Sequence, residues 1–219
     1  MRRLTSLLGI ALGLYISNAA SAQTFGSQGS GVISVERVFG IHGTHRSTEN
    51  LVDGQDDETE DATGITFAWR GSGEGAGAAA SAFDAPRAAF DYFIVERVSV
   101  GGALAWASVS LEDAGADSAS AFLFAPRAGY AYMLSNVVGI WPRGGVTYHS
   151  AGVDPGASEN GLALTLEGMF VFVPAQHFAV LVGPTLDLDI IGSFEPEAGP
   201  ERDRRYRTFA LQVGMSGWF

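Results

Sequence analysis

The sequence predicts an all-β protein: a transmembrane antiparallel up-and-down β-barrel, most simply of eight strands, preceded by a cleaved signal peptide. Apolar residues alternate with small or polar residues along most of the chain, and a period of two indicates strands. The bulky apolar residues share one face, as expected of strands with lipid outside and a polar interior. No apolar run after the signal peptide is long enough for a spanning helix, so a chain that crosses a membrane must close into a barrel.

The first 22 residues have the pattern of a secretory signal peptide. Arg2 and Arg3 form a short positive region, and an apolar run follows from Leu4 to Ile16. Ala20-Ser21-Ala22 supplies the small residues of a signal-peptidase site. The apolar run is shorter than the roughly 20 residues of a spanning helix, so an uncleaved anchor is the weaker alternative. The predicted organisation is a signal peptide at 1–22, a periplasmic lead-in at 23–31 and a barrel at 32–219.

Composition excludes several functions. The chain of 219 residues contains no cysteine, which excludes disulfides and thiolate metal sites. Its formal net charge is −11 at pH 7, whereas a nucleic-acid partner would require clustered positive charge. The same net charge excludes direct attraction to anionic lipopolysaccharide, since like charges repel, and leaves contact through bridging divalent ions. We expect no cofactor and no resident metal ion.

The first predicted strand runs from Val32 to His45. Arg37 falls on its apolar face, so either this side chain reaches out from near the membrane boundary or a β-bulge shifts the register. Residues 46–82 are predicted to form a large extracellular loop, acidic at first and then rich in glycine and alanine. The acidic run 49–61 lacks the spacing of a calcium-binding loop and indicates a solvated segment. Gly64–Arg70 is either a hairpin strand within this loop or a further strand of the barrel wall.

Six further strands form three hairpins with short turns. They are predicted at Phe83–Ile94 with Arg97–Leu111, Phe122–Met133 with Val137–Ser150, and Leu162–Phe172 with Phe178–Ile191. The longer connections between hairpins are rich in Asp, Glu and Gly and are predicted at Glu112–Ser118, Ala151–Gly161 and Gly192–Asp203. Short turns on one side and long polar loops on the other are typical of membrane barrels. With the first and last strands the count is eight, which leaves both termini on one side.

Charged residues within the strands fall on the inward face. Three strands repeat one pattern, Ala85-Pro86-Arg87, Ala125-Pro126-Arg127 and Trp141-Pro142-Arg143, and alternation turns each arginine inward. An arginine facing lipid near the bilayer centre would cost about 2–4 kcal/mol. The predicted interior polar network comprises Glu36, Arg87, Asp91, Arg127, Arg143, Glu167, Asp187 and Asp189. Side chains fill an eight-stranded barrel, so this network is expected to close the lumen, with an ion pathway as the alternative.

The last strand carries a second signal. The last strand is predicted at Arg205–Phe219, and from Phe209 onward one face holds glycine or an apolar residue at every second position before the chain ends on an aromatic side chain; the signal residues are Phe209, Leu211, Val213, Met215 and Phe219. This ending resembles the C-terminal strand of bacterial outer-membrane β-barrels, in which such a pattern is the signal for the assembly machinery. As architecture, the chain after the signal peptide resembles the small barrels of the OmpA transmembrane domain and OmpX type. The resemblance implies location in the bacterial outer membrane, contact with outer-membrane lipid and lipopolysaccharide, export with periplasmic chaperones and the β-barrel assembly machinery, and a monomeric state.

The resemblance leaves three functions open. The first is a non-enzymatic barrel with a closed, charge-paired interior that serves envelope integrity or a surface partner. The second is a narrow channel for ions or small solutes. The third is a lipid-modifying enzyme, for which His149 is the candidate base. Ser150 points to the opposite face and is a poor nucleophile for it, which leaves a serine more distant in sequence as the alternative. We therefore predict no catalytic residues and treat His149 as a solvated or interfacial side chain.

Overall fold

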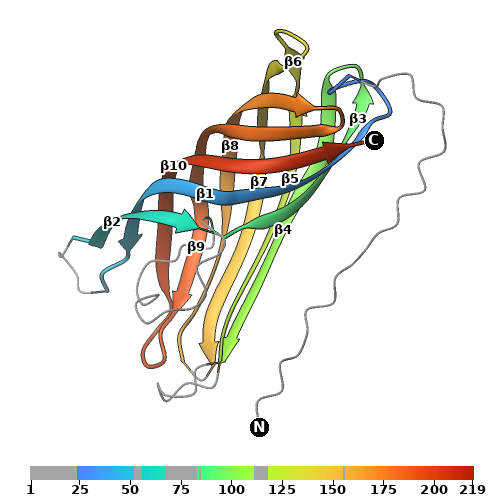
Figure 1. Cartoon of the computed structure of the whole chain (residues 1–219). Coiled ribbons are helices and arrows are strands. Elements are labelled where there is room, and N and C mark those ends of the chain that lie inside the picture. The colour runs from blue at the N-terminus through green and yellow to red at the C-terminus, as the bar shows by residue number, and fades with distance from the viewer. Residues whose placement is uncertain (1–23, 52–55, 68–82, 84, 111–117, 155) are drawn as a thin grey trace.

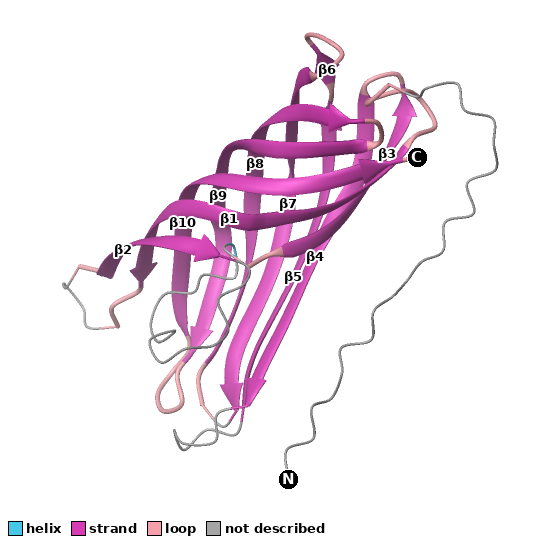
Figure 2. Ribbon diagram, viewed as in Figure 1, coloured by secondary structure: helices cyan, strands magenta, loops and turns pink. Residues whose placement is uncertain are grey.

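Antiparallel strands make up almost all of the computed structural model (Figure 2), which describes residues 24–51, 56–67, 83, 85–110, 118–154 and 156–219. The strands are β1 (Gly31–Thr48), β2 (Glu58–Phe67), β3 (Arg87–Val95), β4 (Val98–Ser110), β5 (Ser118–Tyr130), β6 (Tyr132–Met133), β7 (Val138–Asp154), β8 (Ser158–Ala175), β9 (Phe178–Glu195) and β10 (Arg202–Trp218). Within these residues, no helix is long and apolar enough to cross a membrane.

Eight of the described strands close into a ring (Figure 1). The hydrogen-bonded order is β10-β9-β8-β7-β5-β4-β3-β1, and antiparallel pairing of β1 with β10 completes the circle. The closing register runs from Val32 opposite Trp218 to Thr48 opposite Arg204. Closure satisfies the backbone groups that an open sheet would expose. The predicted antiparallel β-barrel is confirmed, with β2 and β6 as additional strands outside the ring.

Two strands share the position beside β1. β3 pairs with its first part, from Gly31 to Glu36, and β2 pairs with the remainder, from Phe39 to Thr48. β2 therefore lengthens the β1 wall as the second strand of a hairpin (Figure 1). This arrangement agrees with the hairpin interpretation of Gly64–Arg70, but the strand begins earlier, at Glu58. Residues 68–82 of the predicted loop lie outside the described part of the chain.

Several strands extend beyond the apolar segments from which they were predicted. β7 and β8 stay paired up to Gly152 and Ser158, and the β9–β10 ladder reaches Phe194 opposite Arg202. The connections predicted at Ala151–Gly161 and Gly192–Asp203 are therefore too long, because an antiparallel ladder can continue through polar residues beyond the apolar belt. The connection predicted at Glu112–Ser118 lies outside the described residues except for Ser118, which begins β5.

The barrel has two distinct ends. We call the end with the C-terminus and the short turns after β3, β6 and β8 the turn end, and the opposite end the loop end (Figure 1). On the outer surface, bulky apolar side chains form a belt that includes Leu104, Leu166 and Phe170. The alternate positions face the lumen and are small and buried, as at Ala103 and Ala163. Period-two alternation thus places the apolar surface outside.

Candidate functional site

A β-bulge in β1 turns two consecutive charged residues into the lumen. The ladder with β10 shifts between Val35 and Phe39, and Arg37 has a φ of 55°. Adjacent strand residues normally face opposite sides, but here Glu36 and Arg37 are both buried inside. The bulge interpretation of Arg37 is therefore correct, and the alternative of a side chain reaching out of the membrane is wrong. This arginine joins the interior network, from which the sequence prediction left it out.

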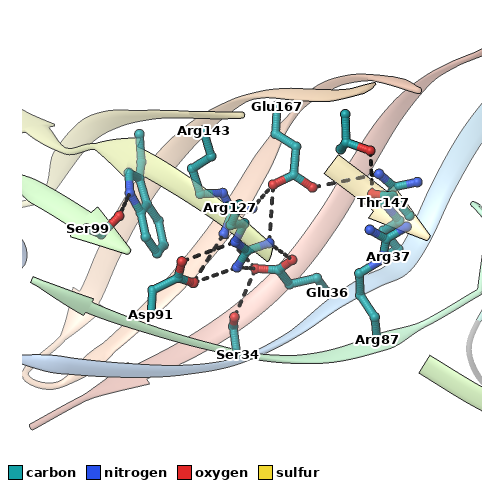
Figure 3. Close-up of polar contacts among 12 residues, drawn as sticks. Ser34, Glu36, Arg37, Arg87, Asp91, Ser99, Arg127, Arg143, Thr147 and Glu167 are labelled. Atoms are coloured by element: carbon teal, nitrogen blue, oxygen red, sulfur yellow. Dashed lines mark hydrogen bonds and ion pairs between the residues drawn. The ribbon is translucent and has the colours of Figure 1, made fainter. Parts of the chain in front are cut away.

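Arg127 and Arg143 are the centre of this network (Figure 3). Arg127 donates to both carboxylate oxygens of Glu36, at 2.7 and 2.8 Å, and to those of Asp91, at 3.1 and 2.5 Å. The guanidinium nitrogens of Arg143 lie 2.6 Å from a carboxylate oxygen of Glu36 and 2.9 Å from one of Glu167. Paired, bidentate contacts of this kind are among the stronger hydrogen bonds in proteins. The carboxylates of Glu36, Asp91 and Glu167 thus each contact at least one guanidinium group.

Arg37 and Arg87 extend the network towards the loop end. Arg37 donates to Asp187 at 2.8 and 3.2 Å, and Thr165 donates to the same carboxylate at 2.7 Å. Arg87 donates to the backbone carbonyl of Phe83 at 3.0 Å, and Arg37 donates to that carbonyl as well. A cavity of about 10 Å³ lies beside Arg87. Arg87 shares the layer, although no carboxylate lies within ion-pair distance of it among the described residues.

We call this group the charge layer. It contains four arginines, Arg37, Arg87, Arg127 and Arg143, and four carboxylates, Glu36, Asp91, Glu167 and Asp187, all at most 8% exposed. Formal charge in the layer therefore sums to zero, which is what an interior of low dielectric requires of so many buried ions. Of the residues predicted from sequence, only Asp189 lies elsewhere.

A glycine makes room for the layer. A Cβ atom on Gly129 would lie 2.7 Å from Nε1 of Trp141 and 2.8 Å from Cγ of Arg143. Trp141 in turn donates to Ser99 at 3.1 Å and lies under the Arg143 guanidinium, 4.5 Å from its ring centre. Small residues at inward positions therefore leave room for long side chains that extend from neighbouring strands.

An apolar layer covers the charge layer on the side of the turn end. Phe25, from the segment before β1, enters the lumen and meets Phe93, Trp141 and Trp218 edge-on, with ring centres 5.2–5.8 Å apart. Backbone hydrogen bonds hold this segment in place, including one from Arg97 to the carbonyl of Gly26. The turn-end layer also contains Val32, Ala131, Met169, Val171, Ala179 and Leu181. The residues predicted as a periplasmic lead-in thus contribute to the interior.

Phe83 covers the charge layer on the side of the loop end. The sequence predicts it as the first residue of a strand, but β3 begins only at Arg87 and Phe83 is fully buried inside the barrel. Its ring lies 4.8 Å from the ring of His149 and 6.5 Å from that of Tyr206. The prediction was wrong because two buried guanidinium groups draw the Phe83 carbonyl inward, and local alternation cannot reveal those contacts.

Asp189 belongs to a separate group of polar side chains on the loop-end side of Phe83. One of its carboxylate oxygens accepts a hydrogen bond from the backbone N–H of Tyr206, at 2.9 Å, and the other lies 3.0 Å from Nε2 of His149. The hydroxyl of Tyr206 donates to Glu159 at 2.6 Å. His149 is 2% exposed and is not the solvated or interfacial side chain predicted from sequence. Among the described residues, no group of three or more His, Asp or Glu side chains could hold a metal ion.

The predicted assembly-signal residues lie on the outer surface of β10. Phe209 is 61% exposed, Leu211 is 50% exposed and Met215 is 39% exposed. Val213 shares this face. Phe219 follows the strand and exchanges two backbone hydrogen bonds of 3.0 Å with Gly31, which extends the seam between the first and last strands to the last residue. These residues form a continuous outward apolar row at the closing seam.

Comparison with known proteins identifies the fold. No protein-family model and no curated protein sequence matches the chain. The solid-state NMR structure of outer membrane protein AlkL in DMPC lipid bilayers matches 93% of this chain and 96% of its own, at 12% identity and a TM-score of 0.57. OprG from Pseudomonas aeruginosa matches 88% of this chain and 97% of its own, at 12% identity and a TM-score of 0.48. Neisserial surface protein A matches 87% and 99%, at 11% identity and a TM-score of 0.47.

At these identities a structural likeness establishes architecture and not activity. The match to AlkL extends over nearly the whole of both chains, and the closed antiparallel ring described above is the shared feature. The chain therefore has the fold of a small outer-membrane β-barrel.

Proposed function

We propose that this protein is a non-enzymatic barrel of the bacterial outer membrane whose closed interior maintains a rigid wall in the envelope and presents its loop end to a surface partner. The observation that carries the proposal is the neutral charge layer, which fills the lumen between the turn-end layer and Phe83. On this proposal the turn end faces the periplasm and the loop end faces the exterior. Outer-membrane lipid and lipopolysaccharide surround a monomer, which periplasmic chaperones and the β-barrel assembly machinery deliver.

Three features support closure over conduction. An ion crossing the lumen would have to displace Phe25 and Trp141 at one side and Phe83 at the other, all of them packed against other rings. It would also have to break the contacts of Arg127, and a buried charge that loses its partner costs several kcal/mol. The small cavity beside Arg87 has room for about one water molecule, not for a file of them.

Conductance tests this proposal against the channel alternative. The refolded protein in planar bilayers is expected to show no steady unit conductance, since the turn-end layer, the charge layer and Phe83 seal the lumen. Heat-modifiable migration on gels would verify that the same preparation is folded. Steady single-channel steps from folded protein would contradict the closed interior and establish the channel.

Mass spectrometry of lipid A tests the enzyme alternative. Lipid A is expected to have the same mass in cells with and without the protein. A change in mass that His149→Ala abolishes would overturn the non-enzymatic proposal.

Membrane insertion follows from the apolar belt and has its own test. Because the chain lacks cysteine, single cysteines can carry spin labels without further changes. Labels at Leu164 and Leu166, which face outward, are expected to be accessible to oxygen dissolved in the lipid and shielded from a water-soluble relaxation agent. A label at Ala163, which faces the lumen, is the matched control and should be shielded from both. Equal lipid contact at positions 163 and 164 would refute insertion by this outer surface.

A further inference from the structure

Arginines are concentrated at the loop end of the closing seam, although the chain as a whole is acidic. The formal net charge is −11, yet β10 opens with Arg202, Arg204, Arg205 and Arg207, and Arg46 lies on the neighbouring β1. In the register of the seam, Arg46 stands opposite Tyr206, between two of these arginines. Carboxylates at the same rim pair with several of these arginines: Arg46 with Glu60, Arg204 with Glu159 and Arg205 with Asp203. What this rim offers to a ligand therefore depends on which guanidinium groups stay exposed to solvent, and not on the net charge of the chain.

Alternation divides these arginines between the two faces of the wall. Arg204 is partly buried and donates to Thr48 at 3.1 Å and to Glu159 at 3.2 Å. Arg205 and Arg207 are exposed and alternate with the buried Tyr206 and therefore point outward, away from the lumen. We call this pair the rim arginines.

Ion pairing within the protein leaves the rim arginines largely available. Arg205 lies 3.6 Å from Asp203, with side chains 57% and 67% exposed, and an exposed pair of this kind contributes about 0–1 kcal/mol. Among the described residues, no carboxylate lies within ion-pair distance of Arg207. His45, which stands opposite Arg207 on β1, is bound at 2.7 Å to Asp61, which is itself 84% exposed. The surface thus offers two guanidinium groups beside two solvated carboxylates.

The surroundings of the rim arginines are apolar on the membrane side. Phe209, two residues further along the same face, is 61% exposed. On β9, a bulge opposite β8 leaves Ile190 and Ile191 exposed at 53% and 65%, close to Leu188, which pairs with Arg207. Guanidinium groups directly above an apolar surface sit at the height at which a bilayer changes from acyl chains to headgroups.

We propose that the rim arginines bind a phosphate group of lipid A, with the lipid's acyl chains lying on Phe209 and the β9 isoleucines. A phosphate accepts paired hydrogen bonds from the planar fork of an arginine, and the apolar surface below supplies the contact that a free phosphate would lack. This inference rests on the membrane location proposed above. It departs from the expectation that net negative charge excludes direct attraction, because a phosphate at hydrogen-bond distance interacts with the nearest guanidinium groups more strongly than with the distant charges of the chain.

The test measures lipid retention on the folded full-length mature protein in detergent micelles by native mass spectrometry. Bisphosphorylated lipid A is expected to be retained on the order of tenfold more than dephosphorylated lipid A, and the double variant R205Q/R207Q should lose that preference. R97Q removes one exposed arginine at the turn end and is the matched control, which should retain it. Inorganic phosphate should not displace the lipid, because it makes no apolar contact.

Four outcomes would overturn the inference. They are equal retention of the two lipid A forms by the parent protein, the same loss in R97Q as in the double variant, displacement by inorganic phosphate, and equal retention of phosphatidylglycerol. Flotation of the protein with lipid vesicles separates this inference from the membrane location. A protein that fails to float overturns both, whereas a protein that floats but shows no lipid preference overturns only the phosphate site.

Discussion

Replacing Glu36 with alanine is expected to lower the free energy of unfolding by about 3–5 kcal/mol, the range for breaking a buried ion pair by removing one partner. Glu36 contacts Arg127 through both carboxylate oxygens and Arg143 through one of them. Without it, the charge layer keeps four arginines but only three carboxylates, and the excess charge has no access to water. Urea unfolding in lipid vesicles, followed by tryptophan fluorescence, measures the change.

The matched control for this variant is Glu195→Ala, which removes the same side chain from an exposed position at the end of β9. Its effect should stay within about 0.5 kcal/mol, as for most surface substitutions. A loss of less than about 1 kcal/mol in Glu36→Ala would show that Asp91 and Glu167 compensate Arg127 and Arg143 on their own. The layer would then contain more carboxylates than its arginines need, and its stability would not depend on an equal number of positive and negative charges.

Trp141→Ala should cost a similar amount, about 3–5 kcal/mol, for an apolar reason. The indole is fully buried, and its ring centre lies 5.2 Å from that of Phe25 and 4.5 Å from Cζ of Arg143. Its removal leaves a cavity between the turn-end layer and the charge layer, and Ser99 loses its hydrogen-bond donor. The same unfolding experiment detects the loss, and bilayer recordings are expected to show increased leak through the weakened seal.

Trp106→Ala is the control for Trp141→Ala, because it deletes the same side chain from the outer surface, where Trp106 is 77% exposed. It should unfold nearly like the parent protein and show no added leak. If the two variants lost equal stability, the interior position of Trp141 would not matter, and the turn-end layer would not be the seal that we propose.

Much of the fold could be predicted because strand geometry is local. The side chains of residues i and i+2 share a face whatever the rest of the chain does, so the inward positions of Arg127, Arg143 and Glu167 follow from alternation. The same rule placed Phe209 and Leu211 outside. Strand ends were less accurate, because polar residues beyond the apolar belt continue the ladders without leaving a hydrophobicity signal.

Arg37 and Phe83 could not be assigned in this way. A positive φ at a residue other than glycine costs about 1–2 kcal/mol, and Arg37 adopts it because its side chain then reaches Asp187, 150 residues away in sequence. Phe83 leaves the strand pattern because Arg37 and Arg87 bind its carbonyl oxygen. The one available signal for Arg37 was its position on the wrong face, which indicates either a bulge or a membrane boundary.

The sequence by itself determined the strand rhythm, the two faces of the wall and the outward apolar row at the end of the chain, since each depends on neighbours within a few residues. Tertiary structure decided which charges meet. It moved Asp189 out of the charge layer and Arg37 into it, and it brought Arg46 beside the arginines of β10. The physical reason is that ring closure sets distances between strands far apart in the chain, and electrostatic energy depends on those distances and not on sequence order.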